Sequence, residues 1–254
     1  MLLWFVTPFV TWWSGKPLVK PVSKLTLEQH IFLRKIARKT WSFFERFVGQ
    51  EDNWLPPDNF QEQPSVQIAH RTSPTNIGLS LLASVTACEF GYLTTGQLIE
   101  RTTRTMNTMK KMERCKGHFY NWYDTQTLEV LRPPYISTVD SGNLAGHLLT
   151  LRQGLLALVN APVLRPVYLD GLEDTLDVLT ESIGTSLPEV LNQFRKLLYA
   201  AQVSFHKWPE AIQHSQKLCE VAERIATQHQ NSEIKGVKKW SQKLHAQCID
   251  LADM

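Results

Sequence analysis

The chain has 254 residues, 43% of them hydrophobic, which is enough to bury the core of one large domain. Its formal net charge of +3 is too small to indicate nucleic-acid binding, and no basic run alternates with aromatic residues. The cysteines form no CxxC pair, which argues against a zinc knuckle or a disulfide framework; they are Cys88, Cys115, Cys219 and Cys248.

The chain begins with an apolar run, Met1 to Trp13, that contains a proline. A complete membrane span needs about 20 residues, and the run also lacks the basic start and the cleavage site of a signal peptide. Tryptophans at its end, with Lys16 and Lys20 after them, are typical of a membrane interface. We expect the end of a membrane helix here, or alternatively a short helix packed on the domain, followed by a linker over residues 16–24.

Cap residues and apolar spacing predict a series of helices. Thr26 and Gln29 form a capping box for the first of them, and Gly49 is expected to end it as a C-cap. Its basic residues are expected to form a solvated face: Arg34, Lys35, Arg38 and Lys39. The later expected caps are Asn76, Thr94 and Asp140 with Ser141. The later predicted helices are 77–90, 94–116, 140–159, 170–183, 187–201, 208–228 and 233–254.

Antiparallel pairs of such helices stack into a solenoid or into a closed, double-layered barrel. No repeat of fixed period favours the solenoid. We therefore predict an all-α fold of antiparallel helix pairs that forms part of an (α/α)-barrel, with one short β-hairpin near residues 118–131. Two domains are expected: 1–24 as the end of a membrane helix with its linker, and 25–254 as the helical barrel, incomplete at its C-terminus.

Four dense blocks mix aromatic rings with carboxylates and amides: residues 53–62, 69–76, 118–124 and 137–147. Sugars are bound by rings that stack on their apolar faces and by polar groups that fix their hydroxyls. Among the candidates we expect Trp54, Tyr120 and Trp122 to act as stacking platforms. The full set of predicted substrate-binding residues is Trp54, Asp58, Asn59, Glu62, His70, Arg71, Tyr120, Asn121, Trp122, Asp124, Asp140 and Asn143.

The carboxylates of these blocks do not establish a catalytic pair. Glycosidic chemistry needs two carboxyl groups about 5 to 9 Å apart, and sequence alone brings no two of them into range. Asp140 has a structural alternative as a helix cap, and Asp58 has one in an Asx-turn. Glu62 has no evident structural role. A metal site built from His70, Asp58 and Glu62 has no recognised spacing, so no metal is predicted.

The motifs WLPPDNFQE, AHRTSPTNIG, GHFYNWYDT and STVDSGNLAGHL, in this order, resemble the central region of bacterial cyclic β-1,2-glucan synthases. The resemblance covers Met1 to about Leu158 and is only general beyond Asn160. It implies that Met1–Trp13 is the end of the last membrane helix of a glycosyltransferase part. From Asn53 onward it implies the start of a cyclisation domain, an (α/α)-barrel that performs retaining transglycosylation on β-1,2-glucan.

The resemblance also implies what this sequence lacks. The family's downstream glutamate-bearing motifs are absent, so we expect the catalytic carboxylates to lie elsewhere and this piece alone to be inactive. No cofactor is expected for it, whereas the glycosyltransferase part of the complete protein would use UDP-glucose. The expected partner is β-1,2-glucan, and the expected location is the bacterial inner membrane, with the soluble part on the cytoplasmic side.

Two other classes of function stay open at this point. One is a stand-alone (α/α)-barrel glycoside hydrolase in which Glu62 and Asp140 form the carboxylate pair. The other is a non-enzymatic helical scaffold, in which the four blocks only cap helices and fill the core.

Overall fold

The computed structural model describes residues 2–16, 25–184, 188–205, 208–234 and 236–254. The chain divides into two compact units, Met1–Phe32 and Leu33–Met254. The predicted linker falls mostly on residues 17–24, which lie outside the described residues. The division into domains 1–24 and 25–254 therefore stays a prediction.

The first unit contains helix α1, Leu2–Ser14, and the first residues of α2, Leu27–Phe47. The predicted capping box is confirmed, because Thr26 N donates to Gln29 Oε1 (3.0 Å) and Gln29 N donates to Thr26 Oγ1 (3.2 Å). Among the described residues, no helix combines the length and the apolar character that crossing a membrane requires. This finding gives no support to the prediction that Met1–Trp13 is the end of a membrane helix.

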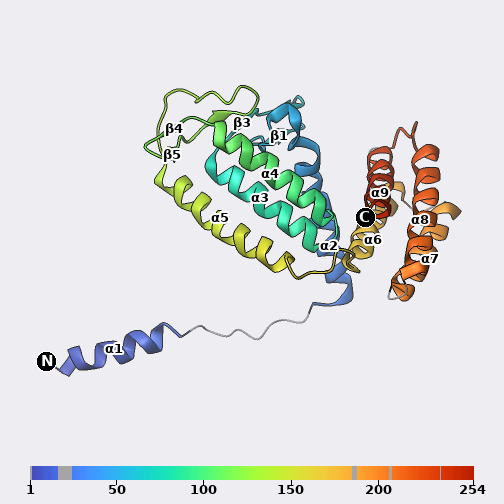
Figure 1. Ribbon diagram of the computed structural model, residues 1–254, viewed down its shortest axis with the longest axis horizontal. Helices are drawn as coiled ribbons and strands as arrows, with labels where there is room; N and C mark the ends of the chain where they lie inside the picture. Colours follow the sequence, from blue (N-terminus) through green and yellow to red (C-terminus); the bar gives the residue numbers. More distant parts are fainter. Residues whose placement is uncertain (1, 17–24, 185–187, 206–207, 235) are drawn as a thin grey trace. The chain divides into compact units, whose positions relative to one another are not determined.

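The second unit is built mostly from helices, which Figure 1 shows in chain order. Helices α3 and α4 are joined by a short connection and are antiparallel, and the predicted all-α fold of antiparallel helix pairs is confirmed. After α2 its elements are η1 Gln50–Asp52, β1 Phe60–Gln61, β2 Gln67–Ile68, β3 Arg71–Thr72, α3 Pro74–Glu89, α4 Thr95–Lys111, β4 Arg114–Cys115, β5 His118–Phe119, β6 Tyr123–Asp124, α5 Thr138–Leu158, α6 Val167–Ile183, α7 Glu189–Ser204, α8 Trp208–Gln228 and α9 Val237–Ala252.

Helices α3 and α5 pack closely and run parallel to each other (Figure 1). A Cβ atom on Gly78 would lie 2.3 Å from Nδ1 of His147, and one on Gly154 would lie 2.9 Å from Cγ1 of Val85. From the first contact to the second, the residue number rises by seven in both helices, from 78 to 85 and from 147 to 154. The two helices therefore run in the same direction. The N-terminal ends of α3 and α5 therefore lie at the same end of the pair, and the polar blocks precede both of them.

Helices α6 to α9 pack against one another and enclose a core of their own (Figure 1). Leu172, Leu176, Phe194, Leu218 and Leu244 in this core are fully buried. These helices match the last four predicted helices to within a few residues, because their apolar spacing already defined one buried face on each.

A buried polar network connects α2 to α6 and α9. Arg38 has no exposed surface; its Nε donates to Thr175 Oγ1 (2.7 Å), and its two terminal nitrogens donate to the carboxylate of Glu45 (3.1 and 3.2 Å). Lys243 of α9 also bonds to Glu45. The prediction of a solvated basic face is therefore wrong for Arg38, since the ion pair and hydrogen bonds compensate its burial.

Arg34 departs from the predicted solvated face as well. Its guanidinium contacts the buried carboxylate of Asp174 through Nε (2.8 Å) and Nη2 (2.8 Å), and Tyr92 Oη donates to the same carboxylate (2.8 Å). Burial raises the pKa of Asp174 although Arg34 and Tyr92 oppose this, so Arg34 only partly offsets the cost of enclosing this carboxylate. Lys35 and Lys39 do lie toward solvent, where both pair with Glu181.

Several predicted caps are displaced by a few residues. Ser73 caps α3 and Ser137 caps α5, so that Asn76 and Asp140 lie inside the first turns of these helices. Gly49 is extended, with φ of −144°, and precedes η1, so it is not a C-cap. Serine followed by proline or threonine is the stronger start signal at both helices, because the hydroxyl reaches the backbone N–H three residues on.

The predicted hairpin is present but shorter, and a second hairpin precedes it. Leu131 N donates to the carbonyl of Trp122 and Asp124 N to that of Glu129, which closes the hairpin over residues 122–131. His118 and Phe119 instead form β5, which pairs with β4. Strand β6 pairs in addition with β3, with Arg71 opposite Asp124.

Replacing Arg38 with Gln should lower the free energy of unfolding by about 3 kcal/mol, because Glu45 loses a bidentate partner inside the protein. The matched change Lys35→Gln on the same helix should cost less than about 1 kcal/mol, since its ion pair with Glu181 is exposed to solvent. Urea denaturation of both variants measures the difference. Equal losses in the two would contradict the buried network.

Candidate functional site

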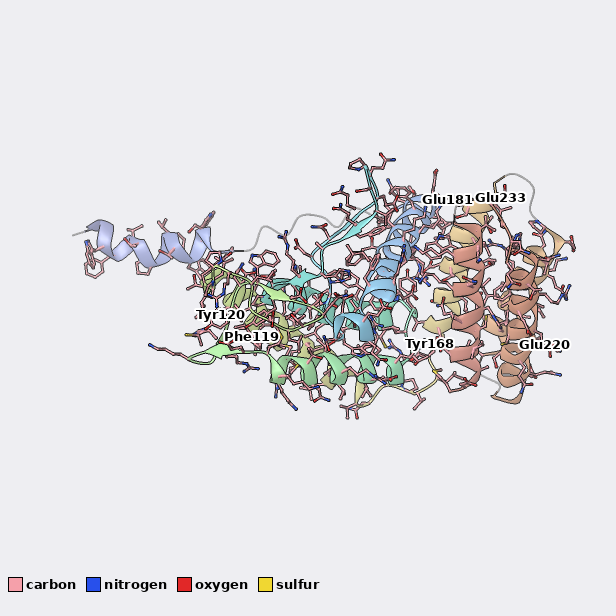
Figure 2. All side chains as sticks on the ribbon, turned by 90° about the horizontal axis from the view of Figure 1, so that it is seen from above. Phe119, Tyr120, Tyr168, Glu181, Glu220 and Glu233 are labelled. Atoms are coloured by element: carbon pink, nitrogen blue, oxygen red, sulfur yellow. The ribbon has the colours of Figure 1, made fainter. Side chains whose placement is uncertain are left out.

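The polar blocks meet at the N-terminal ends of α3 and α5. Pairing of β3 with β6 joins the second block to the third, and the fourth block forms the first turns of α5. Figure 2 shows Phe119, the last residue of β5, close to Tyr120, which follows it. The fold thus gathers segments that are separated by more than sixty residues in the chain.

Asp58 is the first centre of this cluster. Its Oδ2 accepts from Arg71 Nε (3.2 Å) and Nη2 (3.0 Å), and its Oδ1 accepts from Asn76 Nδ2 (3.1 Å). Asn59 Nδ2 lies 3.2 Å from the same carboxylate. The Arg71 guanidinium stacks on the Trp122 ring, 4.9 Å from its centroid, so the ion pair also orients the indole.

Asn121 links Trp122 to Asp140. The amide is buried, and only one orientation satisfies its neighbours, because an indole N–H can donate but not accept. In that orientation the amide oxygen accepts from Trp122 Nε1 (2.8 Å) and Tyr135 Oη (2.6 Å), and the nitrogen donates to Asp140 Oδ2 (2.9 Å). A continuous chain of contacts therefore runs from Asp58 through Arg71, Trp122 and Asn121 to Asp140.

Asp140 lies in the first turn of α5, where the helix dipole favours a negative charge. Burial alone would raise the pKa of its carboxyl group, but hydrogen bonds from Ser137, Thr75 and Ser73 outweigh that cost and lower the pKa. Asn143, one turn further on, donates to Thr75 Oγ1 (3.1 Å). Asp140 is thus an ionised acceptor held at the helix end.

His70 is held by a carboxylate that sequence reasoning did not single out. Its Nδ1 lies 2.7 Å from Oδ1 of Asp52, and Thr125 also donates to that oxygen. Asp52 is buried, while about a third of the His70 side chain is exposed at 34%. Asp52 thus ties η1 to His70 just before β3 and, through Thr125, to the hairpin, and the imidazole stays partly exposed.

Other predicted residues lie outside this chain of contacts. The Asp124 carboxylate accepts from the backbone N–H groups of Gln126 and Thr127 (2.8 Å each), so it closes the hairpin turn. Tyr120 packs edge-on against Tyr123, at a centroid distance of 6.5 Å.

Trp54 and Glu62 face different neighbours again. The Trp54 ring lies over α4, with the guanidinium of Arg104 4.6 Å and that of Arg101 5.8 Å from its centroid. Glu62 is exposed and interacts electrostatically with Lys239 of α9, whereas Asp140 is bonded to Ser137, Thr75 and Ser73.

Four contributors were missed as site residues: Asp52, Thr75, Asn76 and Tyr135. Thr75 and Asn76 belong to the second block, but helix capping accounted for the end of that block. Asp52 stands just before the first block, and Tyr135 follows two prolines, so neither position carries a local signal of its contacts. Within the described residues, no group of three or more His, Cys, Asp or Glu side chains is arranged to hold a metal ion.

Comparison with known proteins shows what this chain is similar to. No family model matches the sequence. The chain is 37% identical over 225 residues to the cyclic beta-(1,2)-glucan synthase NdvB of Rhizobium meliloti, a match that covers 87% of the chain. The chain is related to the cyclic β-(1,2)-glucan synthases. The match to this glucan synthase extends past Leu158, because it covers 225 residues and residues 1–158 are fewer than that.

The chain spans only 8% of the length of that glucan synthase, so the activity of the whole relative is not established for it. Among solved structures, a putative glucoamylase from Bacteroides fragilis matches with a TM-score of 0.46 and 17% identity. That match covers 63% of this chain and 38% of the glucoamylase chain.

Replacing Asp140 with Asn should lower the free energy of unfolding by about 1 kcal/mol at pH 7, because a charged acceptor of several hydrogen bonds is lost. The folded-state pKa of Asp140 is depressed, so its contribution is complete above the ordinary carboxyl pKa of about 4 and is lost as pH falls through the folded pKa. The difference between variant and wild type should therefore shrink at acid pH. Urea denaturation at several pH values measures it.

Asp124→Asn is the matched control for that experiment. An asparagine side chain accepts the same two backbone N–H groups in the turn, so this variant should stay close to wild type across the pH range. A constant loss for Asp140→Asn at every pH would contradict the assignment of an ionised Asp140.

Proposed function

We propose that this chain binds β-1,2-glucan as part of the (α/α)-barrel that carries out transglycosylation in a cyclic β-1,2-glucan synthase. The observation that carries the proposal is the chain of contacts Asp58–Arg71–Trp122–Asn121–Asp140 at the ends of α3 and α5. It combines a half-buried indole with fixed carboxylates, an amide and a guanidinium. Groups of this kind recognise the apolar face and the hydroxyls of a pyranose ring.

Preorganisation supports the proposal. Every polar side chain in the contact chain is oriented by a neighbour, so little side-chain freedom remains to be lost when a sugar binds. Trp122 is half-buried and Asn121 is buried, while Tyr135 at the edge of the cluster is exposed. The rings of Trp122 and Tyr135 are thus partly or largely exposed. A non-enzymatic scaffold would instead enclose the aromatic residues of the blocks in its core.

The carboxylates of the cluster favour binding over cleavage. A glycosidic general acid needs a raised pKa, but hydrogen bonds lower that of Asp140. Asp58 is held by Arg71 and Asn76, and Asp124 closes a turn. Because Glu62 and Asp140 have different surroundings, a hydrolase that uses this pair is the weaker alternative. We therefore propose that the transfer step needs carboxylates other than these.

The predicted membrane attachment through Met1–Trp13 does not enter the proposal, because no helix among the described residues is suited to span a membrane. The inner-membrane location implied by the family resemblance stays a prediction. UDP-glucose likewise belongs to the expected glycosyltransferase part and not to the contacts described for this chain.

Calorimetric titration of the 254-residue chain with linear β-1,2-linked glucose oligosaccharides tests the proposal. Trp122→Ala should weaken binding at least about tenfold, or about 1.4 kcal/mol, because the ring and the orientation of Arg71 are lost together. Tyr199→Ala removes an exposed ring from α7, outside the cluster, and should leave the affinity unchanged. Absence of binding by the wild-type chain would refute the proposal.

A further inference from the structure

A second cavity lies beside the loop that carries Trp54. It has a volume of about 380 Å³ and lies between the end of α2, this loop, α4 and α9. That volume is within the range of small-molecule sites, about 300 to 1,000 Å³. Its lining includes Trp54, Glu100, Arg101, Lys243 and Asp250, which none of the contacts around Asp58 and Asp140 involves.

The backbone at Trp54 is held in a conformation that bulky residues rarely adopt. Asn53 and Trp54 have φ of 52° and 62°, in the left-handed region. Thr108 and Thr105 of α4 donate to their two carbonyls (2.7 and 2.9 Å), and Trp54 N donates to the carbonyl of Gly49 (2.8 Å). These bonds fix the loop so that a partly exposed indole lines the cavity. Residues in such conformations cluster at active sites and ligand-binding sites.

The cavity repeats the composition of the first cluster. Arg104 stacks on Trp54 and pairs with Glu100 (2.6 Å), as Arg71 stacks on Trp122 and pairs with Asp58. In both places a carboxylate fixes a guanidinium, and the guanidinium fixes an indole. The repetition involves different elements, so one pairing does not follow from the other.

The lining of the cavity includes a hydrogen-bond donor that no protein group among the described residues accepts. Nε of Arg101 is buried and has no hydrogen-bond partner among the described residues, and burial lowers the pKa of this side chain. Burial also raises the pKa of Asp250, and a hydrogen bond with Gln97 opposes this shift. The lining carries both signs of charge, which favours a neutral, hydroxyl-rich ligand over an anion or a cation.

We infer that the cavity between Trp54, α4 and α9 is a second binding site for a glucose unit of β-1,2-glucan, with Trp54 as its platform. This inference builds on the proposed function and adds a site separate from the Trp122 cluster. Arg101, Glu100 and Asp250 would contact the hydroxyls of the bound unit, since each lines the cavity.

Titration of linear β-1,2-linked glucose oligosaccharides into three variants of the full chain tests the second site. Trp54→Gly removes the ring, and glycine adopts the same φ without strain, so the loop keeps its course. Ala246→Phe leaves the loop intact and fills the cavity from α9, where Ala246 is exposed. Each of these changes should weaken binding about tenfold or more. Gln242→Phe, at an exposed position of α9 outside the lining, should leave it unchanged.

The outcomes separate this inference from the proposed function. Wild-type affinity in both Trp54→Gly and Ala246→Phe, with a loss in Trp122→Ala, overturns the second site alone. Losses in the first two variants with an unaffected Trp122→Ala support the second site and overturn the role of the Trp122 cluster. No binding by the wild-type chain overturns both. A shift of the Trp54 indole N–H resonance on titration, absent in Ala246→Phe, provides independent support.

Discussion

The buried guanidinium of Arg38 is the interaction on which the arrangement of the second unit depends. A charge with no exposed surface is strongly destabilising unless every polar group around it is paired, and Arg38 obtains its partners from α2 itself and from α6. It also lies about 5 Å from the Tyr92 and Trp240 rings. Helix α2 can therefore occupy its place only when α6 and α9 are in theirs, and Glu45 then contributes to the cavity beside Trp54.

A second constraint is the close approach of α3 and α5. The His147 ring occupies the space next to Gly78, so any side chain at that position would separate the helices. Because the two helices start at the same end, Asp140 in the first turn of α5 comes within reach of Ser73 and Thr75 at the start of α3. A packing contact between Gly78 and His147, inside the two helices, thus sets the geometry of the polar cluster at their ends. This close packing has an energetic cost, because Nδ1 of His147 is buried and lacks a hydrogen-bond partner among the described residues.

Local features of this fold could be predicted from the sequence, whereas its long-range contacts could not. Capping pairs and apolar spacing located the helices to within a few residues, since both depend on neighbours three or four positions away. Arg38 looked like its solvated neighbours Lys35 and Lys39, because its partner Thr175 is 137 positions away. Trp54 and Trp122 likewise stand in similar blocks of sequence. The left-handed backbone at Asn53 and Trp54, which the sequence does not indicate, accompanies the placement of the Trp54 ring beside α4.

The two tryptophans show how a partly exposed ring can be held without a hydrophobic core around it. Rotation of an indole at the surface would carry an entropic cost for any ligand that stacks on it. A guanidinium on the ring, itself fixed by Asp58 or Glu100, limits that rotation before a ligand arrives. Both guanidiniums donate Nε and Nη2 to one carboxylate oxygen, but the Asp58 side chain is only 20% exposed and also accepts from Asn76, whereas Glu100 is 55% exposed. Salt therefore weakens the Glu100 pair more. Ionic strength should therefore loosen the Trp54 platform before the Trp122 platform, which makes the second site the more adaptable of the two.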